Sequence, residues 1–135
     1  MAKVNSKDWR NLPIEKWNTN TVHAFLIDET KRRFDAEYVP GGKGSRQQRW
    51  IAEKGMIKRE LQRRGPEVVR KFIEICWREY RTSNPSRFPY PTFGFMIGFM
   101  DRHWIDAERA VQEGEGFEGI TKTDEVVTDI NDDWF

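Results

Sequence analysis

The stretch PEVVRKFIEICWREY, residues 66–80, decides the fold class of this chain. Its apolar residues recur every three or four positions, as they do along one side of an α-helix. The charged residues between them are expected on the outer face: Glu67, Arg70, Lys71, Glu74 and Arg78. The pattern predicts an amphipathic helix that packs one face against a core.

Three further helices are predicted around this one. Residues 18–34 begin with Asn and Thr as cap candidates and end in three cations, which suits the helix dipole. Ser45 is expected to cap a helix from Arg46 to about Arg64, Gly65 to end it, and Pro66 to open residues 66–80. Residues 93–113 form the fourth, and their apolar first half predicts the central, most buried helix.

These elements predict an all-α fold, a compact bundle of about four helices. An irregular lead-in precedes them over residues 1–17, and its tryptophans are expected to pack on the body. The chain divides into a helical domain with a basic surface, residues 1–112, and an acidic, aromatic-tipped tail, residues 113–135. The glycines and acidic residues of the tail predict a mobile segment.

No apolar run approaches the roughly 20 residues of a membrane span, and none resembles a signal peptide. A single cysteine, Cys76, falls within the apolar pattern and is expected to be a buried, inert thiol. These observations predict a cytoplasmic protein, in the host cytoplasm if a phage encodes it, with no membrane partner.

Charge is unevenly distributed along the chain. Residues 1–110 hold 22 Lys/Arg against 14 Asp/Glu, whereas residues 111–135 hold one Lys against eight Asp/Glu. The stretch from Lys43 to Arg64 alone carries eight cations and two glutamates. An arginine-rich surface of this kind favours contacts with the phosphates of single- or double-stranded DNA. The residues predicted to make them are Lys43, Arg46, Arg49, Lys58, Arg59, Arg63 and Arg64.

Two other interpretations of the basic stretch stay open. Helices often carry charge that is only solvated, so the cations need not bind anything. The segment GGKGS, residues 41–45, combines the residue types of a phosphate-binding loop, but the order of Lys43, Gly44 and Ser45 differs from that motif and no strand precedes it. A linker that ends in a helix cap explains it better.

The tail alternates acidic with apolar residues, which suits docking at a basic groove. The residues predicted to bind a protein partner are Asp129, Ile130, Asp132, Asp133, Trp134 and Phe135. The final DDWF resembles the acidic tips of single-stranded DNA-binding proteins. The resemblance implies that Asp132 and Asp133 supply charge and that Phe135 enters a pocket; Trp134 stands where those tips usually have proline.

Catalysis is not predicted. His23 and His103 are the only histidines, and neither belongs to a metal-binding pattern such as His-Glu-x-x-His. The grouping of Asp101, His103 and Asp106 is explained by ion pairing along a helix. We therefore expect no catalytic residues, no metal and no cofactor.

The body offers a second resemblance. The segments EYVPGGKGSRQQRW, GPEVVRKFIEICWREY and FPYPTFGFM resemble, in their layout, small helical replication accessory proteins of phages, of the helicase-loader kind. This resemblance implies a protein that engages a replicative helicase or its DNA and catalyses no reaction itself.

The leading hypothesis is a non-enzymatic accessory protein of DNA replication or another nucleic-acid transaction, which binds DNA through its basic helical face and a protein through its tail. The alternative is a protein-interaction module that redirects or inhibits a host machine, such as RNA polymerase, a helicase or a nuclease, without binding nucleic acid. A structural subunit of a larger assembly is a third possibility. The partner, the base preference and the oligomeric state do not follow from the sequence.

Overall fold

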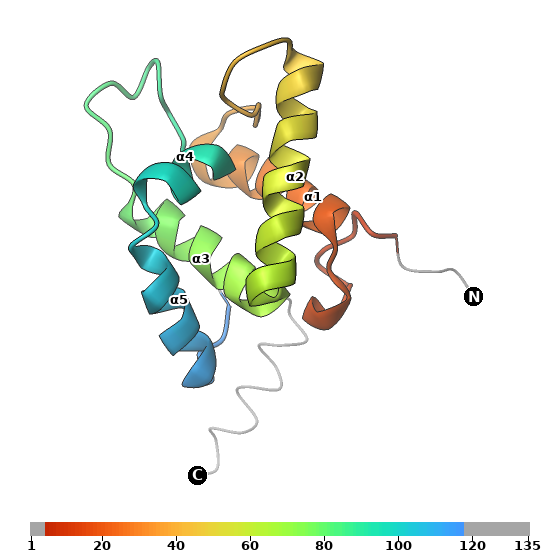
Figure 1. Ribbon diagram of the computed structural model, residues 1–135. Helices are drawn as coiled ribbons and strands as arrows, with labels where there is room; N and C mark the ends of the chain where they lie inside the picture. The colour runs from red at the N-terminus through yellow and green to blue at the C-terminus, as the bar shows by residue number, and fades with distance from the viewer. Residues whose placement is uncertain (1–4, 118–135) are drawn as a thin grey trace.

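The computed structural model describes residues 5–117 of the chain. These residues form helices and no β-strand, so the predicted all-α fold is confirmed. Figure 1 shows α3 in the middle of the bundle, with α5 alongside it. The elements are the 3-10 turn η1 (Ile14–Lys16) and the α-helices α1 (Thr19–Phe34), α2 (Arg46–Arg64), α3 (Pro66–Glu79), α4 (Phe93–Phe99) and α5 (His103–Gln112). Within this part of the chain, no helix is long and apolar enough to cross a membrane.

The predicted helix starts are confirmed at the atomic level. Asn18 accepts a hydrogen bond from the backbone amide of Thr21 and thereby caps α1. Ser45 caps α2 in the same way through the amide of Gln48, whose side chain bonds back to Ser45. Gly65 joins α2 to α3 with a φ of 87°, a conformation that glycine adopts without strain, and Pro66 begins α3.

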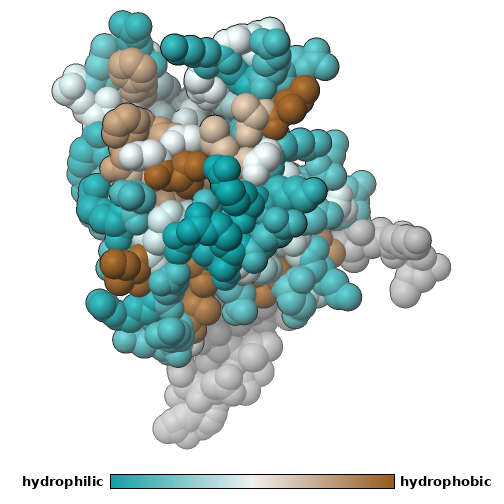
Figure 2. Space-filling model, viewed as in Figure 1, coloured by the Kyte–Doolittle hydropathy of each residue, from teal (hydrophilic) through white to brown (hydrophobic). Residues whose placement is uncertain are grey.

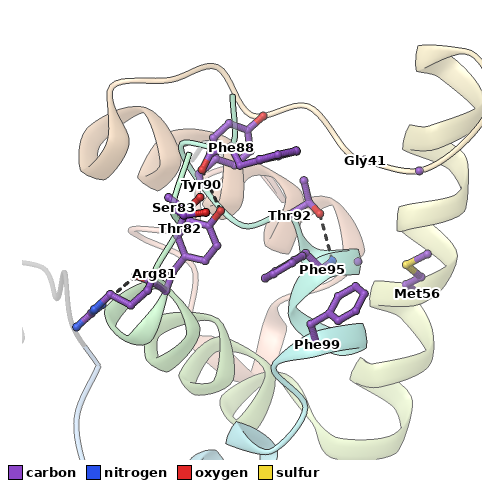
Figure 3. A pocket seen from close by; sticks show the side chains of 13 residues that line it. Gly41, Met56, Arg81, Thr82, Ser83, Phe88, Tyr90, Thr92, Phe95 and Phe99 are labelled. Carbon is purple, nitrogen blue, oxygen red and sulfur yellow. Dashed lines mark hydrogen bonds between the residues drawn. The ribbon is translucent and has the colours of Figure 1, made fainter. Parts of the chain in front are cut away.

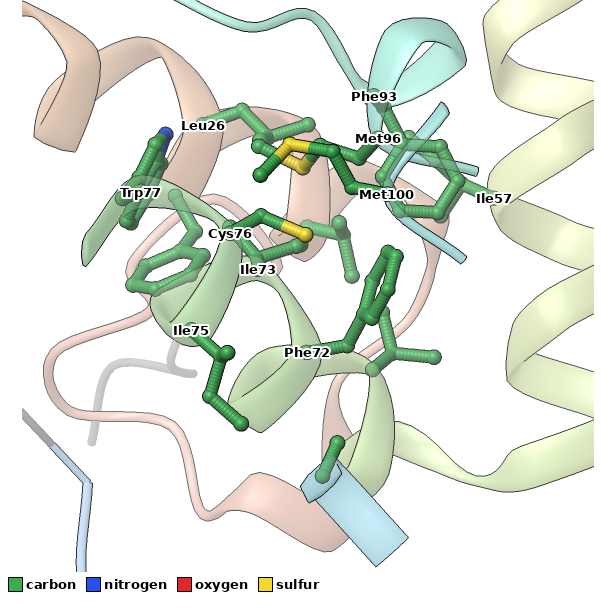
Figure 4. Packing of buried hydrophobic residues seen from close by; sticks show 14 of the residues in the cluster. Leu26, Ile57, Phe72, Ile73, Ile75, Cys76, Trp77, Phe93, Met96 and Met100 are labelled. Carbon is green, nitrogen blue, oxygen red and sulfur yellow. The ribbon is translucent and has the colours of Figure 1, made fainter. Parts of the chain in front are cut away.

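α3 is the most buried helix, because every residue from Val69 to Trp77 is buried. Figure 4 shows its side chains at the centre of the apolar cluster. The prediction that the fourth helix is the central one is wrong: in α4 only Phe93 and Met96 are buried, and Phe99 is 71% exposed. α4 is apolar on all sides because one side is buried in the core and the other is an exposed apolar face.

The charged face of α3 is also not where the sequence placed it. Arg70, Lys71 and Glu74 are buried, contrary to the prediction of an outer face. Glu74 accepts a hydrogen bond from Arg70 Nε at 3.0 Å and lies 3.7 Å from Lys71 Nζ. The guanidinium of Arg70 packs over the rings of Trp17 and Phe117. The segments before α1 and after α5 thus cover a face that periodicity alone leaves open to solvent.

The predicted lead-in, residues 1–17, packs on the body through its tryptophans. The Trp9 indole donates a hydrogen bond to Asp28 at 2.8 Å, and its ring lies edge-on to Phe25 with centroids 5.0 Å apart. Trp17 contacts the same ring at 5.2 Å. Such aromatic pairs add roughly 0.5–1.5 kcal/mol each beyond the area they bury, so the described part of the lead-in belongs to the core.

The segment predicted as one fourth helix is two helices. α4 ends where Met100 leaves helical geometry, with φ −124° and ψ 22°, and α5 begins at His103. The bend lets α4 pack against α2 while α5 lies along α3. Buried residues keep helical spacing on both sides of the break, at Phe93, Met96, Met100, Trp104 and Ala107. The periodicity of apolar residues therefore cannot reveal the break between α4 and α5.

A buried polar cluster connects four parts of the fold. Glu53 of α2 accepts a hydrogen bond from the Tyr38 hydroxyl at 2.6 Å, and His23 Nε2 of α1 lies 3.1 Å from the same carboxylate oxygen. The Tyr38 hydroxyl in turn accepts the backbone amide of Phe93, the first residue of α4. Burial, followed by the charge of Glu53, raises the pKa of Tyr38 well above its usual value.

Replacing Tyr38 with Phe should destabilise the protein. The substitution leaves the buried Glu53 carboxylate and the Phe93 amide short of a partner, and each such loss costs about 1–3 kcal/mol. Urea denaturation should show a free energy of unfolding lowered by at least about 1 kcal/mol. Tyr80→Phe is the matched control, because its hydroxyl bonds the exposed Phe88 carbonyl and its loss should matter by less than about 0.5 kcal/mol. Equal effects of the two substitutions would contradict this role of Tyr38.

Glu29 of α1 is buried beside two arginines. Arg32 Nη2 and Arg33 Nε donate hydrogen bonds to it at 2.6 and 3.1 Å. Burial raises the pKa of Glu29, but together the two arginines outweigh burial and hold the pKa below the usual 4.5. The ionised carboxylate therefore stabilises the folded state above about pH 4.5, and this contribution is lost as the pH falls through the folded-state pKa.

Glu29→Gln should lower the free energy of unfolding at pH 7 by about 1–3 kcal/mol, since it removes the charged acceptor of these hydrogen bonds. The difference in the free energy of unfolding between the variant and the unsubstituted protein should become smaller as the pH falls below 4.5. Urea denaturation at intervals between pH 7 and pH 3 measures both effects, with the exposed Glu37→Gln as control. A difference that stays constant over this range would show that the charge of Glu29 does not matter.

Candidate functional site

The cations predicted to bind nucleic acid lie on α2 and on the loop before it, but they do not form one surface. Arg46 borders a hollow with His23 and Trp50. Lys58 borders a hollow beside the start of α1. Three of the predicted cations lie on the other side of α2, in a hollow facing α5: Arg59, Arg63 and Arg64. The predicted cations on α2 are therefore divided between two sides of the helix.

Several of these cations are neutralised by carboxylates. Arg46 pairs with Glu37 at 2.7 Å, and Arg63 lies 3.7 Å from Glu60. Arg64 pairs with Glu60 at 3.0 Å and with Glu108 at 2.8 Å, and its guanidinium lies over the Trp104 ring. These contacts give Arg64 a structural role between α2 and α5, because a paired, partly buried guanidinium is less available to a phosphate.

Other cations remain without a carboxylate partner among the described residues. Lys43, Lys58 and Arg59 are exposed, and Lys54, which was not predicted, is exposed one helical turn before Lys58. Arg49 is half-buried, and its Nε finds no hydrogen-bond partner within the described chain. The cations best placed to meet a phosphate are therefore Lys43, Lys54, Lys58 and Arg59.

The predicted partner-binding residues lie outside the described residues: Asp129, Ile130, Asp132, Asp133, Trp134 and Phe135. Their role and the predicted mobility of the tail stay predictions. The first residues after α5 return to α3, where Lys71 donates a hydrogen bond to the Gly116 carbonyl and the Phe117 ring lies 4.6 Å from the Arg70 guanidinium.

The described chain also buries several polar and titratable side chains. Tyr38, Glu53 and His23 are enclosed and satisfy one another. His103 Nδ1 lies 3.2 Å from Asp106, as expected for ion pairing along a helix. Burial raises the pKa of the Cys76 thiol well above its usual value, so this thiol stays protonated. Across residues 5–117, no group of three His, Cys, Asp or Glu side chains could hold a metal ion.

A groove of about 700 Å³ opens between α4, the end of α3, α2 and the connection before α4. We call it the aromatic groove; its principal walls are Met56, Tyr80, Phe88, Tyr90, Phe95 and Phe99. Figure 3 shows the Phe95 and Phe99 rings side by side on α4, across from the loop that carries Phe88. The three phenylalanines of the groove are all exposed, Phe88 by 53%, Phe95 by 39% and Phe99 by 71%.

The walls of the aromatic groove are held in place by hydrogen bonds. The Tyr80 hydroxyl donates to the Phe88 carbonyl at 2.9 Å, which ties the loop to α3. The Tyr90 hydroxyl accepts the Val39 amide at 2.8 Å, which ties the other end of the loop to the connection after α1. Thr92 caps α4 through the amide of Phe95. The groove is therefore a preformed feature of the fold.

Several arginines lie at or beside the aromatic groove. Its lining contains no Asp or Glu. The Arg87 guanidinium lies 5.3 Å from the centre of the Phe88 ring, and Arg102 donates to the Phe99 carbonyl at 3.3 Å. Figure 2 shows apolar surface over α4 and the neighbouring loop, set in a largely hydrophilic face. An apolar site with a cationic rim suits a ligand that is both apolar and acidic.

The sequence held a signal for this groove that the prediction missed. Phe95 and Phe99 are four residues apart and lie on one side of α4, whereas Phe93 and Met96 lie on the buried side. Two phenylalanines opposite a buried stripe indicate an exposed apolar face. Phe88 of the preceding loop is 53% exposed, whereas Phe93, the first residue of α4, is fully buried.

Comparisons with known proteins add no further constraint: no family model, no curated protein and no solved structure matches the chain.

The exposed face of α4 should be dispensable for stability. Phe99→Ser removes a ring that is 71% exposed, so the free energy of unfolding should change by less than about 0.5 kcal/mol. Met96→Ala, on the buried side of the same helix, should lower it by about 2–5 kcal/mol. Urea denaturation compares the two. A large loss for Phe99→Ser would show that Phe99 belongs to the core and not to a binding surface.

Proposed function

We propose that this chain is a non-enzymatic accessory protein that binds DNA through the cations of α2 and the loop before it. The observation that carries the proposal is three exposed side chains without carboxylate partners in the described chain, Lys43, Lys54 and Lys58; Arg59 is also unpaired there but lies on the other side of α2. Lys54 and Lys58 are one turn apart on one side of α2, so both can face the same nucleic-acid backbone. A role in replication is supported by the likeness in layout to helicase-loader proteins.

Binding of this kind is electrostatic and independent of base sequence. Cations that neutralise phosphates release condensed counterions, so affinity falls steeply with salt. Arg63 and Arg64 already pair with Glu60. In this proposal they therefore contribute less to DNA affinity than the unpaired cations do. The C-terminal tail, with Asp129, Ile130 and the residues from Asp132 to Phe135, is left for a protein partner.

The double substitution Lys54→Gln and Lys58→Gln should weaken DNA binding several-fold at 100 mM salt, because two phosphate contacts are lost. The slope of log K against log salt should fall by about 1.5–2, near 0.9 per lost contact for duplex DNA. Fluorescence anisotropy with a labelled 20-nucleotide strand and its duplex, titrated between 50 and 200 mM NaCl, measures both quantities.

The matched control is the double substitution Lys7→Gln and Lys31→Gln, which removes the same charge from the lead-in and α1. Lys31 is already paired with Asp35 at 3.0 Å. Equal weakening by both double variants would mean that only net charge matters. Absence of salt-dependent binding to either DNA at 50 mM NaCl would overturn the proposal.

The aromatic groove favours a second candidate function, a module that binds a protein segment and redirects a host machine without contacting nucleic acid. Its exposed phenylalanines form the kind of apolar patch that marks protein interaction sites. A pull-down from host lysate with the unsubstituted protein and Phe99→Ser separates the two functions. A partner retained only by the unsubstituted protein, together with no affinity for DNA, would favour the interaction module.

A further inference from the structure

The aromatic groove is suited to one segment of this chain itself. We propose that residues 129–135, DINDDWF, dock in this groove within the same molecule, with Trp134 and Phe135 against the exposed rings of Phe95 and Phe99. The acidic residues of the tail predict a basic surface as its target, and the aromatic groove offers an apolar site as well. The inference does not depend on whether α2 binds DNA.

The first support is chemical complementarity. Residues 118–135 carry six acidic residues against one lysine, and their apolar residues include Ile130, Trp134 and Phe135. The groove lining holds no acidic residue. Cations lie along or near its rim, at Lys43, Arg81, Arg87 and Arg102. An acidic segment with two aromatic side chains therefore gains both apolar burial and favourable charge contacts there.

The second support is the position at which the described chain ends. Phe117 lies over Arg70 and Lys71, in the N-terminal half of α3. Tyr80, immediately after the C-terminal end of α3, lines the groove. The helix rise of ~1.5 Å per residue puts Lys71 and Tyr80 about 14 Å apart along the axis. The groove therefore lies at least about 14 Å from Phe117, measured along the axis of α3.

The intervening chain is long enough to cover this displacement. Twelve residue steps separate Phe117 from Asp129. An extended chain advances ~3.3–3.6 Å per residue, so these residues span up to about 40 Å. A tether of this kind holds the segment at an effective concentration of order millimolar. Even a weak intrinsic affinity for the groove then suffices for substantial occupancy within one molecule.

Disulfide trapping in the full chain tests the proposal. Ser83 is exposed at the groove, and the pair Ser83→Cys with Asp132→Cys places one thiol on each side of the proposed contact. Oxidised glutathione serves as oxidant, and non-reducing mass spectrometry follows the intramolecular disulfide. Cys76 does not interfere, because it is buried and its thiol stays protonated.

The matched control replaces Ser83→Cys by Gln62→Cys. Gln62 is exposed near the end of α2, close to where α3 begins, so the tether reaches it at least as easily while the aromatic groove lies elsewhere. We expect the disulfide between positions 83 and 132 to form at least tenfold faster than the one between 62 and 132. Equal rates would overturn the proposal, because they indicate random collision. A disulfide that forms chiefly between two molecules would also overturn it, in favour of a second copy as the occupant.

Two further variants show whether the aromatic residues are responsible. In the 83–132 cysteine pair, Trp134→Ala should lower the rate to that of the 62–132 pair, and this substitution changes no residue of the described helices. Phe95→Ser combined with Phe99→Ser should do the same from the groove side, with circular dichroism to verify helix content. An unchanged rate with Trp134→Ala would rule out the proposed contact whatever the outcome of the groove variant. DNA binding, measured separately by anisotropy, reports on the proposed function alone.

Discussion

The buried carboxylate of Glu53 is the constraint on which the arrangement of the helices depends. A charge removed from water is tolerated only when hydrogen bonds surround it. Here Tyr38 and His23 supply them, and Tyr38 also receives the first amide of α4. The connection after α1, the middle of α2 and the start of α4 are therefore fixed relative to one another. Because α4 and this connection also form walls of the aromatic groove, the same cluster determines its shape.

The local features of the fold could be predicted from the sequence, whereas features that depend on distant contacts could not. Asn18, Ser45 and Gly65 determine helix ends through neighbouring atoms, so those ends were predicted to within a residue. The burial of Arg70 depends on Trp17 and Phe117, which are far away in sequence. The break at Met100 preserves the spacing of buried residues, and no proline marks it; Gly98 precedes Met100 by two residues but lies inside α4, so it does not show where the helix ends.

The same distinction applies to the candidate sites. The cations of α2 were identified from composition, but their partners were not: Glu60 precedes Arg64 by one turn, whereas Glu108 comes from α5. The aromatic groove combines residues from four parts of the chain, among them Met56 and Phe99. Of these features, only the spacing of Phe95 and Phe99 can be seen in the sequence itself, and it led to the wrong prediction that this helix is buried on all sides. A helix that is apolar on every side has two explanations, and the number of neighbours decides between them.

The loop between α3 and α4 forms one wall of the aromatic groove and is fastened mainly at its two ends. Tyr80 and Tyr90 hold those ends, while the residues between them, including Ser83 and Arg87, are exposed. Changes in this exposed stretch alter the wall without disturbing the helical core, because few buried contacts depend on it. Natural selection can therefore diversify what the groove accepts while conserving the scaffold beneath it, much as variable loops on a constant framework diversify recognition in other protein families.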